Sequence, residues 1–265
     1  MNKLWKEFLE KGKLDDCPII DMHAHMGFFY GSHIPYAYPE KVIQRMERAG
    51  VKLSIVIPNL ALYDPDGANR HTIEVVERYP ERFKGYCAIN PNYPDVIKKD
   101  LESYEKYTHI YKGFKLLSDY HLVALSDERY RMVFEYADSN GSIILAHTWA
   151  RSIYDGSEEV EKILKKYKKI RFIAGHSLHD WDKMIEFVKT YDNVYIDLCA
   201  VLDDRGPLEK FVDALGADRI LYGTDFPWFD HHYYIGAVLG SGISEEDSRK
   251  IFYKNAEKLF SVKVS

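Results

Sequence analysis

The sequence predicts an α/β fold in which eight parallel strands alternate with helices and close into a (β/α)8 barrel. Short apolar segments recur along the chain, and amphipathic segments of helical period lie between them. The length of 265 residues also suits one such barrel, for which about 250 residues is usual. No linker rich in Gly, Pro or Ser interrupts this order. We therefore expect a single domain over residues 1–265.

Eight segments rich in Ile, Val, Leu, Tyr or Phe are expected to form strands, because such residues suit a buried sheet. They span residues 17–23, 53–58, 83–89, 111–117, 142–147, 170–176, 193–199 and 219–225. Helices are expected where apolar residues recur at three- and four-residue steps, over residues 39–50, 69–80, 126–141, 158–167 and 182–191. Pro39 and Gly50 flank the first of these helices, and Ser126 and Gly141 are expected to cap the third. A further helix is expected near residues 2–11, and more helix after the eighth strand.

The segment 26–38, MGFFYGSHIPYAY, separates the first strand from the first barrel helix. It is longer than the roughly 2–6 residues that usually connect a strand to a helix. We expect it to act as a lid. Its candidate closing residues are Phe28, Phe29, Tyr30 and His33.

Composition and charge exclude several classes of protein. Hydrophobic residues make up 46% of the chain, which is enough for a large core, and the net charge of −5 lacks the basic excess of nucleic-acid-binding proteins. No apolar segment approaches the ~20 residues that cross a membrane, and the N-terminal segment lacks the features of a signal peptide. Cys17, Cys87 and Cys199 are far apart and form no CxxC motif, so we expect no disulfide framework and a cytoplasmic protein. A homodimer is compatible with the 14% of aromatic residues.

Four histidines and one aspartate stand at the ends of predicted strands. His23 and His25 follow the first strand, His147 ends the fifth, His176 ends the sixth and Asp225 ends the eighth. Alternate residues of a strand share a face, and the carboxyl ends of barrel strands surround the active site. Each residue alone has an ordinary explanation, such as a hydrogen-bonded histidine or a helix cap. Together they predict an open site for a divalent metal, and no cysteine joins the set as a closed zinc site would require.

Several motifs give the chain a resemblance to a known family. They are DMHAH at 21–25, HTW at 147–149, AGHS at 174–177, YGTDFPW at 222–228, and the flanking segments YPERFKGYCAINP at 79–91 and YKNAEKLF at 253–260. With these motifs the chain resembles the amidohydrolase superfamily, and most closely its "amidohydrolase 2" branch. That branch includes aminocarboxymuconate-semialdehyde decarboxylase and related metal-dependent hydrolases and decarboxylases. The likeness covers nearly the whole chain.

The resemblance implies a distorted (β/α)8, or TIM, barrel with a metal site at its rim. The implied metal ligands are His23, His25, His147 and Asp225. His176 would bind a second metal or polarise the bound water or substrate. Some relatives carboxylate a fourth-strand lysine, which here is Lys115, but we favour an ordinary ammonium group. We expect one divalent ion, Zn²⁺ before Mn²⁺, Fe²⁺ or Co²⁺, with two ions as the alternative.

The function expected from these features is metal-dependent hydrolysis of a small anionic amide, ester or lactone. A metal ion lowers the pKa of its bound water, Asp225 would move the water proton, and His176 would stabilise the developing charge. The alternative is decarboxylation of a small aromatic or unsaturated carboxylic acid at the same site. Two further hypotheses are weaker: a histidinol-phosphatase type of phosphoesterase lacks its late DxH motif here, and a non-catalytic barrel would have lost a ligand.

Four residues are expected to contact the small-molecule substrate. Lys115 and Arg151 can pair with an anionic group, and Trp149 and Trp228 can pack on a ring. For each of them a plain packing or solvent-exposed role is the alternative.

Overall fold

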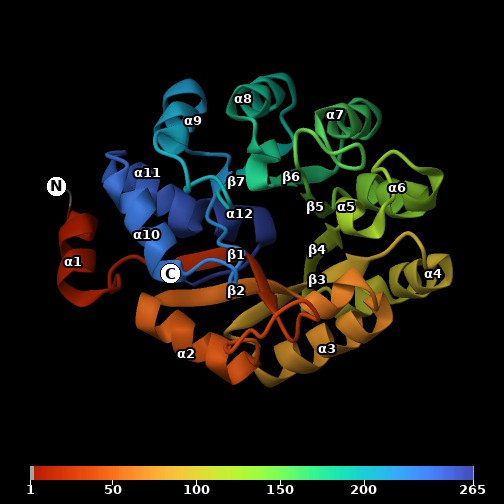
Figure 1. The fold of residues 1–265 in the computed structure, drawn as a ribbon, viewed down its shortest axis with the longest axis horizontal. Helices are drawn as coiled ribbons and strands as arrows, with labels where there is room; N and C mark the ends of the chain where they lie inside the picture. The colour runs from red at the N-terminus through yellow and green to blue at the C-terminus, as the bar shows by residue number, and fades with distance from the viewer. Residues whose placement is uncertain (1–2, 265) are drawn as a thin grey trace.

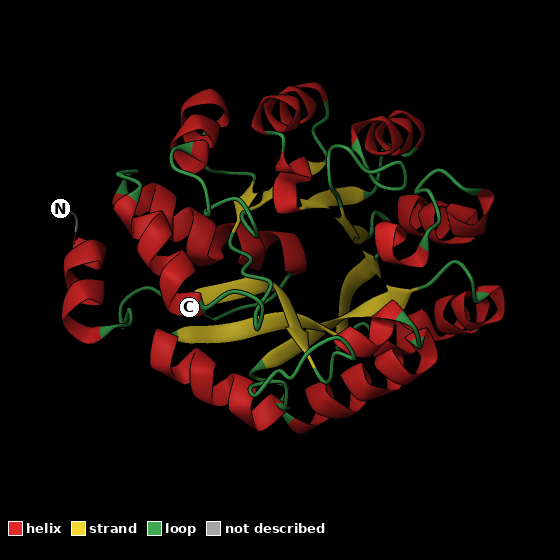
Figure 2. Ribbon diagram, in the orientation of Figure 1, coloured by secondary structure: helices red, strands yellow, loops and turns green. Residues whose placement is uncertain are grey.

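The strands form one parallel sheet whose order follows the chain (Figures 1 and 2). The computed structural model describes residues 3–264. Its strands are β1 (Ile19–Met26), β2 (Val51–Pro58), β3 (Phe83–Ile89), β4 (Tyr111–Leu116), β5 (Ile143–His147), β6 (Arg171–Gly175), β7 (Val194–Asp197) and β8 (Ile220–Leu221). Each strand pairs in parallel with the next, and helices connect them, which confirms the predicted barrel.

The barrel closes between β8 and β1 through backbone hydrogen bonds outside the regular ladders. The N–H of Met22 donates to the carbonyl of Tyr222 at 3.0 Å, and the N–H of Asp225 donates to the carbonyl of His23 at 2.7 Å. The eighth strand is predicted over residues 219–225, but β8 covers only Ile220–Leu221, and Asp225 has a left-handed φ of 59°. The barrel is therefore distorted at the point where the chain carries Asp225.

Helices surround the strands on the outside (Figure 2). They are α1 (Lys3–Lys11), α2 (Pro39–Ala49), α3 (Pro65–Arg78), α4 (Pro94–Ser103), α5 (Ser118–His121), α6 (Arg131–Asn140), α7 (Ser157–Lys166), α8 (Trp181–Thr190), α9 (Pro207–Leu215), α10 (His231–Gly240), α11 (Glu245–Arg249) and α12 (Asn255–Phe260). Short 3₁₀ turns are η1 (Asn59–Leu62), η2 (Tyr104–Tyr107), η3 (Glu128–Tyr130) and η4 (His176–His179), and η5 (Lys250–Lys254) is π-helical. Over residues 3–264, no helix has the length and apolar character needed to cross a bilayer.

Several helices begin where the sequence analysis did not place them. α3 starts at Pro65 rather than residue 69, because the Asp64 side chain accepts a hydrogen bond from a backbone N–H of the first turn. Asp127, not Ser126, caps the third predicted helix, whose first turn is the 3₁₀ turn η3. The helices α4 and α9 are not among the five predicted between strands, and both begin at a proline, which a helix tolerates only in its first turn.

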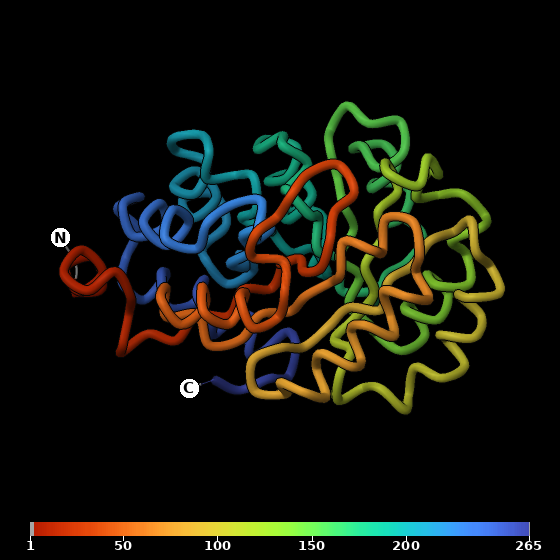
Figure 3. The backbone as a smooth tube through the Cα atoms, turned by 60° about the horizontal axis from the view of Figure 1, so that its bottom comes forward, coloured from red at the N-terminus to blue at the C-terminus, as the bar shows by residue number. Residues whose placement is uncertain are grey.

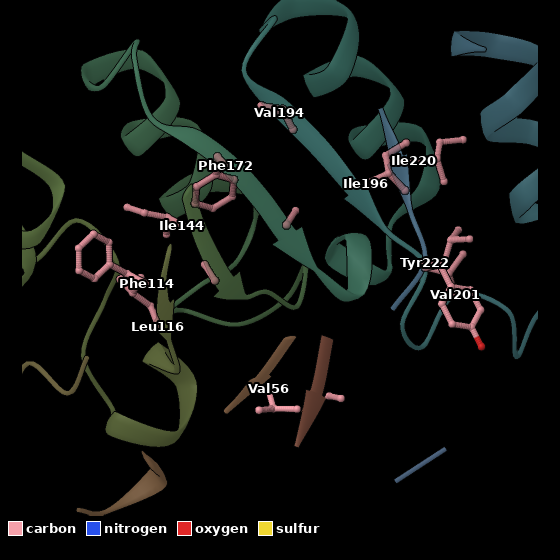
Figure 4. Packing of buried hydrophobic residues seen from close by; sticks show 14 of the residues in the cluster. Val56, Phe114, Leu116, Ile144, Phe172, Val194, Ile196, Val201, Ile220 and Tyr222 are labelled. Carbon is pink, nitrogen blue, oxygen red and sulfur yellow. The ribbon is translucent and has the colours of Figure 1, made fainter. Parts of the chain in front are cut away.

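Apolar side chains fill both the outside of the sheet and one end of its interior. Outward-facing residues of the strands pack beneath the helices, among them Val56, Phe114, Ile144, Phe172, Ile196 and Ile220 (Figure 4). A second buried cluster takes alternate strand positions, such as Ile20, Ile55 and Leu221, together with Leu259 and Phe260 from α12. Ile20 lies near the amino end of β1, and Leu221 lies in the short closing strand β8. The opposite end of the interior is left for polar side chains.

Candidate metal centre

A register shift in β1 places two histidines inside the barrel. From Asp21 to Ala24 the strand advances by three residues, while β2 advances by two, from Ser54 to Val56. Because of this extra residue, Met22 and its neighbour His23 both face the interior. Met22 belongs to the inner apolar cluster, and His23 lines a cavity. His25, two residues on, lines the same cavity, as the alternation of a strand predicts.

Asp225 approaches both of these imidazoles from the other side of the barrel seam. Its Oδ1 lies 2.9 Å from Nε2 of His25 and 3.5 Å from Nε2 of His23. The neighbouring Thr224 fixes this turn, because its hydroxyl and its backbone N–H both donate to the buried carboxylate of Asp21, at 2.6 and 3.1 Å. The first residue of the DMHAH motif thus anchors the residue before Asp225.

Asp197, at the end of β7, holds His23 from behind. Its Oδ2 lies 2.6 Å from Nδ1 of His23, and both side chains are fully buried. This contact assigns the ring proton of His23 to Nδ1 and leaves the lone pair of Nε2 facing Asp225. A carboxylate behind a histidine is the usual partner of a metal-binding imidazole.

His147 and His176 form a second group on the other side of the cavity. Nε2 of His176 lies 3.0 Å from Nδ1 of His147, and its Nδ1 lies 3.1 Å from Sγ of Cys199. His176 is not the end of β6 but the first residue of the turn η4, where it adopts a left-handed φ of 62°. The Cys199 thiol is buried, whereas His147 and His176 line the cavity.

Burial keeps the imidazoles of His23, His147 and His176 neutral. It lowers the pKa of His176 to about 4 and brings the pKa values of His23 and His147 well below their ordinary value. Burial alone would raise the pKa of Asp225, but the imidazoles of His25, His23 and His176 outweigh it and hold that pKa well below its usual range. Neutral imidazoles and an ionised carboxylate are the forms that bind a divalent cation.

The donor atoms test whether a metal ion fits this site. Over residues 3–264, His23, His25 and Asp225 offer three donor atoms within 4.8 Å of one another, and so do His176, Cys199 and Asp225. Two imidazole nitrogens and one carboxylate oxygen suit Zn²⁺ or Mn²⁺ and leave coordination positions open. The residues present therefore fit a divalent ion. Among the described residues, His147 belongs to no such group of donor atoms. Its Nδ1 instead contacts Nε2 of His176, which does belong to one.

Lys115 reaches the same centre from β4. Its side chain is 1% exposed, and Nζ lies 2.6 Å from Nε2 of His23. Burial lowers the pKa of Lys115 below its ordinary value. Among the described residues, Lys115 is the only lysine that lines the cavity, and no arginine lines it.

The cavity above these groups has a volume of about 240 Å³ and is lined by two kinds of side chain. The polar ones are His23, His25, Lys115, His147, His176 and Asp225. The others are mostly apolar or aromatic, and they are Phe29, Pro58, Asn59, Leu62, Leu117, Tyr120 and Trp228. Such a cavity can hold a small flat molecule with one charged end at the metal donors.

The remaining predicted substrate residues lie at different distances from this cavity. Trp228 lines it and is 42% exposed. Trp149 does not line it, although its ring centre lies 6.0 Å from that of His176. Arg151 is exposed in the loop after β5 and lies outside the lining. Substrate roles for Trp149 and Arg151 stay predictions without a contact to the cavity.

The segment predicted as a lid contributes one wall. Figure 3 shows this segment, in red to orange, as a wide loop near the middle of the view. Phe29 lines the cavity, and its ring meets that of Trp228 edge to face at 4.9 Å. Phe28 instead packs on Tyr38 at 5.3 Å, and His33 is exposed.

Sequence reasoning missed three residues of the site. Asp197 and Cys199 lie in the segment NVYIDLC, and Asp21 begins DMHAH. A charged residue inside an otherwise apolar strand is rarely buried without a partner, and this signal was available for Asp21 and Asp197. No comparable signal marks Cys199, since buried cysteines are common in cores.

Solved structures share this fold at low sequence identity. A structure named as an amidohydrolase from Staphylococcus aureus is 18% identical, covers 92% of this chain and all of its own (100%), and has a TM-score of 0.73. The 2,6-dihydroxybenzoate decarboxylase from Rhizobium is 14% identical over 94% of this chain and 99% of its own, with a TM-score of 0.74. The 5-carboxyvanillate decarboxylase from Novosphingobium aromaticivorans, complexed with manganese, is 17% identical over 96% and 97%, with a TM-score of 0.70.

Sequence comparison gives the family. No curated protein matches the chain significantly. The family model described as Amidohydrolase, however, matches residues 20–262. That range holds all five predicted metal ligands and nearly the whole barrel. The chain therefore belongs to the Amidohydrolase family, as its motifs predicted.

Proposed function

We propose that the protein is a metal-dependent decarboxylase of small hydroxylated aromatic acids. The observation that carries the proposal is the cavity of about 240 Å³, which Lys115 and the metal donors line together with aromatic and apolar side chains. This is less than the ~300–1,000 Å³ of sites for drug-sized ligands, so the cavity suits an acid with one ring. The names of two similar structures, decarboxylases of hydroxylated benzoates, support the same class.

Lys115 is the residue that we assign to the substrate carboxylate. Its Nζ contacts the lone pair of His23 Nε2, which a metal ion would need. Lys115 and a cation therefore compete for one acceptor. When a cation binds, the amine must find another partner, and the carboxylate of an aromatic acid supplies one in the same cavity.

The aromatic side chains of the cavity are the groups that we assign to orient the ring. Phe29 and Trp228 meet edge to face at 4.9 Å, and both line the cavity. Leu62 and Leu117 add apolar surface to the lining. Apolar surroundings favour the loss of charge as CO₂ leaves.

Asp225 is the group that we assign to move the proton. Because the surrounding imidazoles hold it ionised, it acts first as a base and takes the proton of a hydroxyl group next to the carboxylate. It then returns that proton to the ring carbon as the bond to the carboxylate breaks, which gives CO₂ and a phenolate that solvent reprotonates. We assign His176, which also lines the cavity, to stabilise the developing negative charge. A bound divalent ion supplies Lewis acidity toward the substrate oxygens.

Hydrolysis of an amide, ester or lactone is the competing function for the same site. The test incubates protein loaded with Zn²⁺ or Mn²⁺ with 2,6-dihydroxybenzoate and with simple lactones, esters and amides. Evolution of CO₂ and formation of resorcinol from the first compound support the proposal. Opening of a lactone or cleavage of an ester, with no CO₂ from any hydroxylated benzoate, would favour the hydrolase instead.

Two variants make the test specific. Asp225→Asn keeps the size of the side chain but removes the base, so CO₂ release should fall at least a hundredfold. Asp203→Asn changes an exposed aspartate outside the cavity and should leave the rate unchanged. Equal loss in both variants would contradict the assigned role of Asp225.

A further inference from the structure

A second, open cavity lies against the first. It has a volume of about 450 Å³ and is lined by Tyr30, Leu62, Tyr63 and Tyr120. Leu62 and Tyr120 also line the inner cavity, so the two spaces share a boundary of side chains. We call this second space the outer cavity.

The outer cavity is built from three separate loops at the rim of the barrel. Tyr30 comes from the loop after β1, Leu62 and Tyr63 from the turn after β2, and Tyr120 from the short helix α5 after β4. None of the four described lining residues carries a charge. The rings of Tyr30 and Tyr63 meet nearly at right angles, at 79° and 6.1 Å, and form two walls of an aromatic corner.

These tyrosines are exposed to an extent that the fold alone does not require. Tyr30, Tyr63 and Tyr120 are 82%, 43% and 56% exposed. In the described chain their hydroxyl groups donate no hydrogen bond to another residue. Exposed aromatic surface that converges on an active-site mouth is typical of a binding site rather than of packing.

We propose that the outer cavity is a subsite for a second planar ring of the substrate. The inference rests on the proposed function, because it places the reacting carboxylate and the first ring in the inner cavity. The inner volume of about 240 Å³ leaves little room beyond one ring. A substituent directed away from the metal donors passes between Leu62 and Tyr120 into the aromatic corner. The preferred substrates are thus aromatic acids that carry a second ring, which bind more tightly than a simple benzoate.

Binding of inert acids tests the subsite separately from catalysis. Benzoate, biphenyl-3-carboxylate and biphenyl-4-carboxylate carry the same charge and differ by one ring, and none has the hydroxyl group that the proposed reaction needs. Calorimetric titration of the purified protein should show at least one biphenyl acid binding about tenfold more tightly than benzoate, since aromatic contacts add to the buried area of the ring. If both biphenyl acids bind no more tightly than benzoate, the subsite is overturned.

A matched pair of tyrosine variants locates the second ring. Tyr63→Ala should remove most of the biphenyl advantage and leave benzoate binding unchanged, because Tyr63 lines only the outer cavity. Tyr93→Ala is the control, since Tyr93 is 45% exposed, much like Tyr63, but lines neither cavity. Tyr30→Ala is the second test variant, because a side chain that is 82% exposed does not support the fold. A biphenyl advantage that survives both test variants would place the ring elsewhere and overturn the proposal.

The two proposals fail in different ways. If the biphenyl advantage depends on Tyr63 but no hydroxylated acid releases CO₂, the subsite stands and the decarboxylase assignment is wrong. If 2,6-dihydroxybenzoate releases CO₂ but the biphenyl acids bind no better than benzoate, the function stands and the second ring is wrong. If none of the three acids binds, the subsite is overturned, and CO₂ release from 2,6-dihydroxybenzoate decides the function separately.

Discussion

Replacement of Asp197 by asparagine should weaken metal binding although Asp197 is not itself an expected ligand. Its carboxylate accepts three hydrogen bonds, from Nδ1 of His23 at 2.6 Å, from the backbone N–H of His176 at 3.2 Å and from the backbone N–H of Cys199 at 3.0 Å. Asparagine must turn an amide –NH₂ toward at least one of these donors. The variant Asp197→Asn therefore loses both a negative charge behind His23 and one acceptor.

The size of the effect follows from these contacts. A buried hydrogen bond to a charged group contributes about 1.5–3 kcal/mol. At 1.4 kcal/mol per tenfold, this corresponds to a loss of roughly 10- to 100-fold in metal affinity, which is the range seen when a carboxylate behind a metal-binding histidine is removed. We expect the dissociation constant for Zn²⁺ or Mn²⁺ to rise by that factor.

Competition of the protein with a chromophoric chelator measures this constant. Asp203→Asn, a change of the same type at an exposed position on the loop after β7, is the control and should bind metal as the wild type does. Circular dichroism establishes that Asp197→Asn is folded. If a folded Asp197→Asn binds metal as tightly as the control, then Asp197 does not prepare His23 for a cation.

Three further predictions concern groups around the cavity. Lys115→Met should weaken benzoate binding at least tenfold in calorimetric titration, because it removes the cation that faces the substrate carboxylate. Burial, with the nearby charge of Asp119, raises the pKa of Asp155 from 3.8 to about 7. Its contribution to stability is therefore full below pH 4 and is lost as pH rises through 7, by up to about 4 kcal/mol at 1.36 kcal/mol per unit. Urea unfolding should show a smaller decline in Asp155→Asn than in wild type, because burial also raises the pKa values of Asp21 and Asp197, which both proteins keep. Cys199→Ala should lower kcat severalfold without changing KM, and Cys199→Ser should restore it, because only the hydroxyl can replace the thiol contact to His176.

Much of the architecture follows from local sequence patterns. The eight apolar segments predict the eight strands because a parallel strand is buried on both faces and needs a continuous apolar run. The spacing of His23 and His25 predicts that both face the interior, and the structure places both at the cavity. The strand-end rule likewise brings His147, His176 and Asp225 to the same cavity.

The parts that were missed depend on contacts between distant segments. The register shift at Asp21 arises from pairing of β1 with β2, and no local pattern marks it. Asp197 contacts His23 across 174 positions of the chain. The contact of Lys115 with His23 is equally remote, at 92 positions, so the sequence could suggest a charged substrate partner but not its competition with a metal ion. These pairings are set by barrel closure, which sequence periodicity does not encode.

The backbone departs from regular strand geometry at the turns that carry the side chains of the site. His176, Ser177 and Asp225 all have left-handed φ values, of 62°, 48° and 59°, although none is glycine. Such a conformation costs about 1–2 kcal/mol per residue, so the surrounding contacts must offset it. The Ser177 hydroxyl donates to the carbonyl of Asp197 at 2.6 Å, and the N–H of Asp225 donates to the carbonyl of His23 at 2.7 Å. Asp197 and His23, which hold each other in place, thus also hold the strained turns that carry His176 and Asp225. One buried hydrogen bond therefore links the side of the cavity with His23, His25 and Asp225 to the side with His147 and His176.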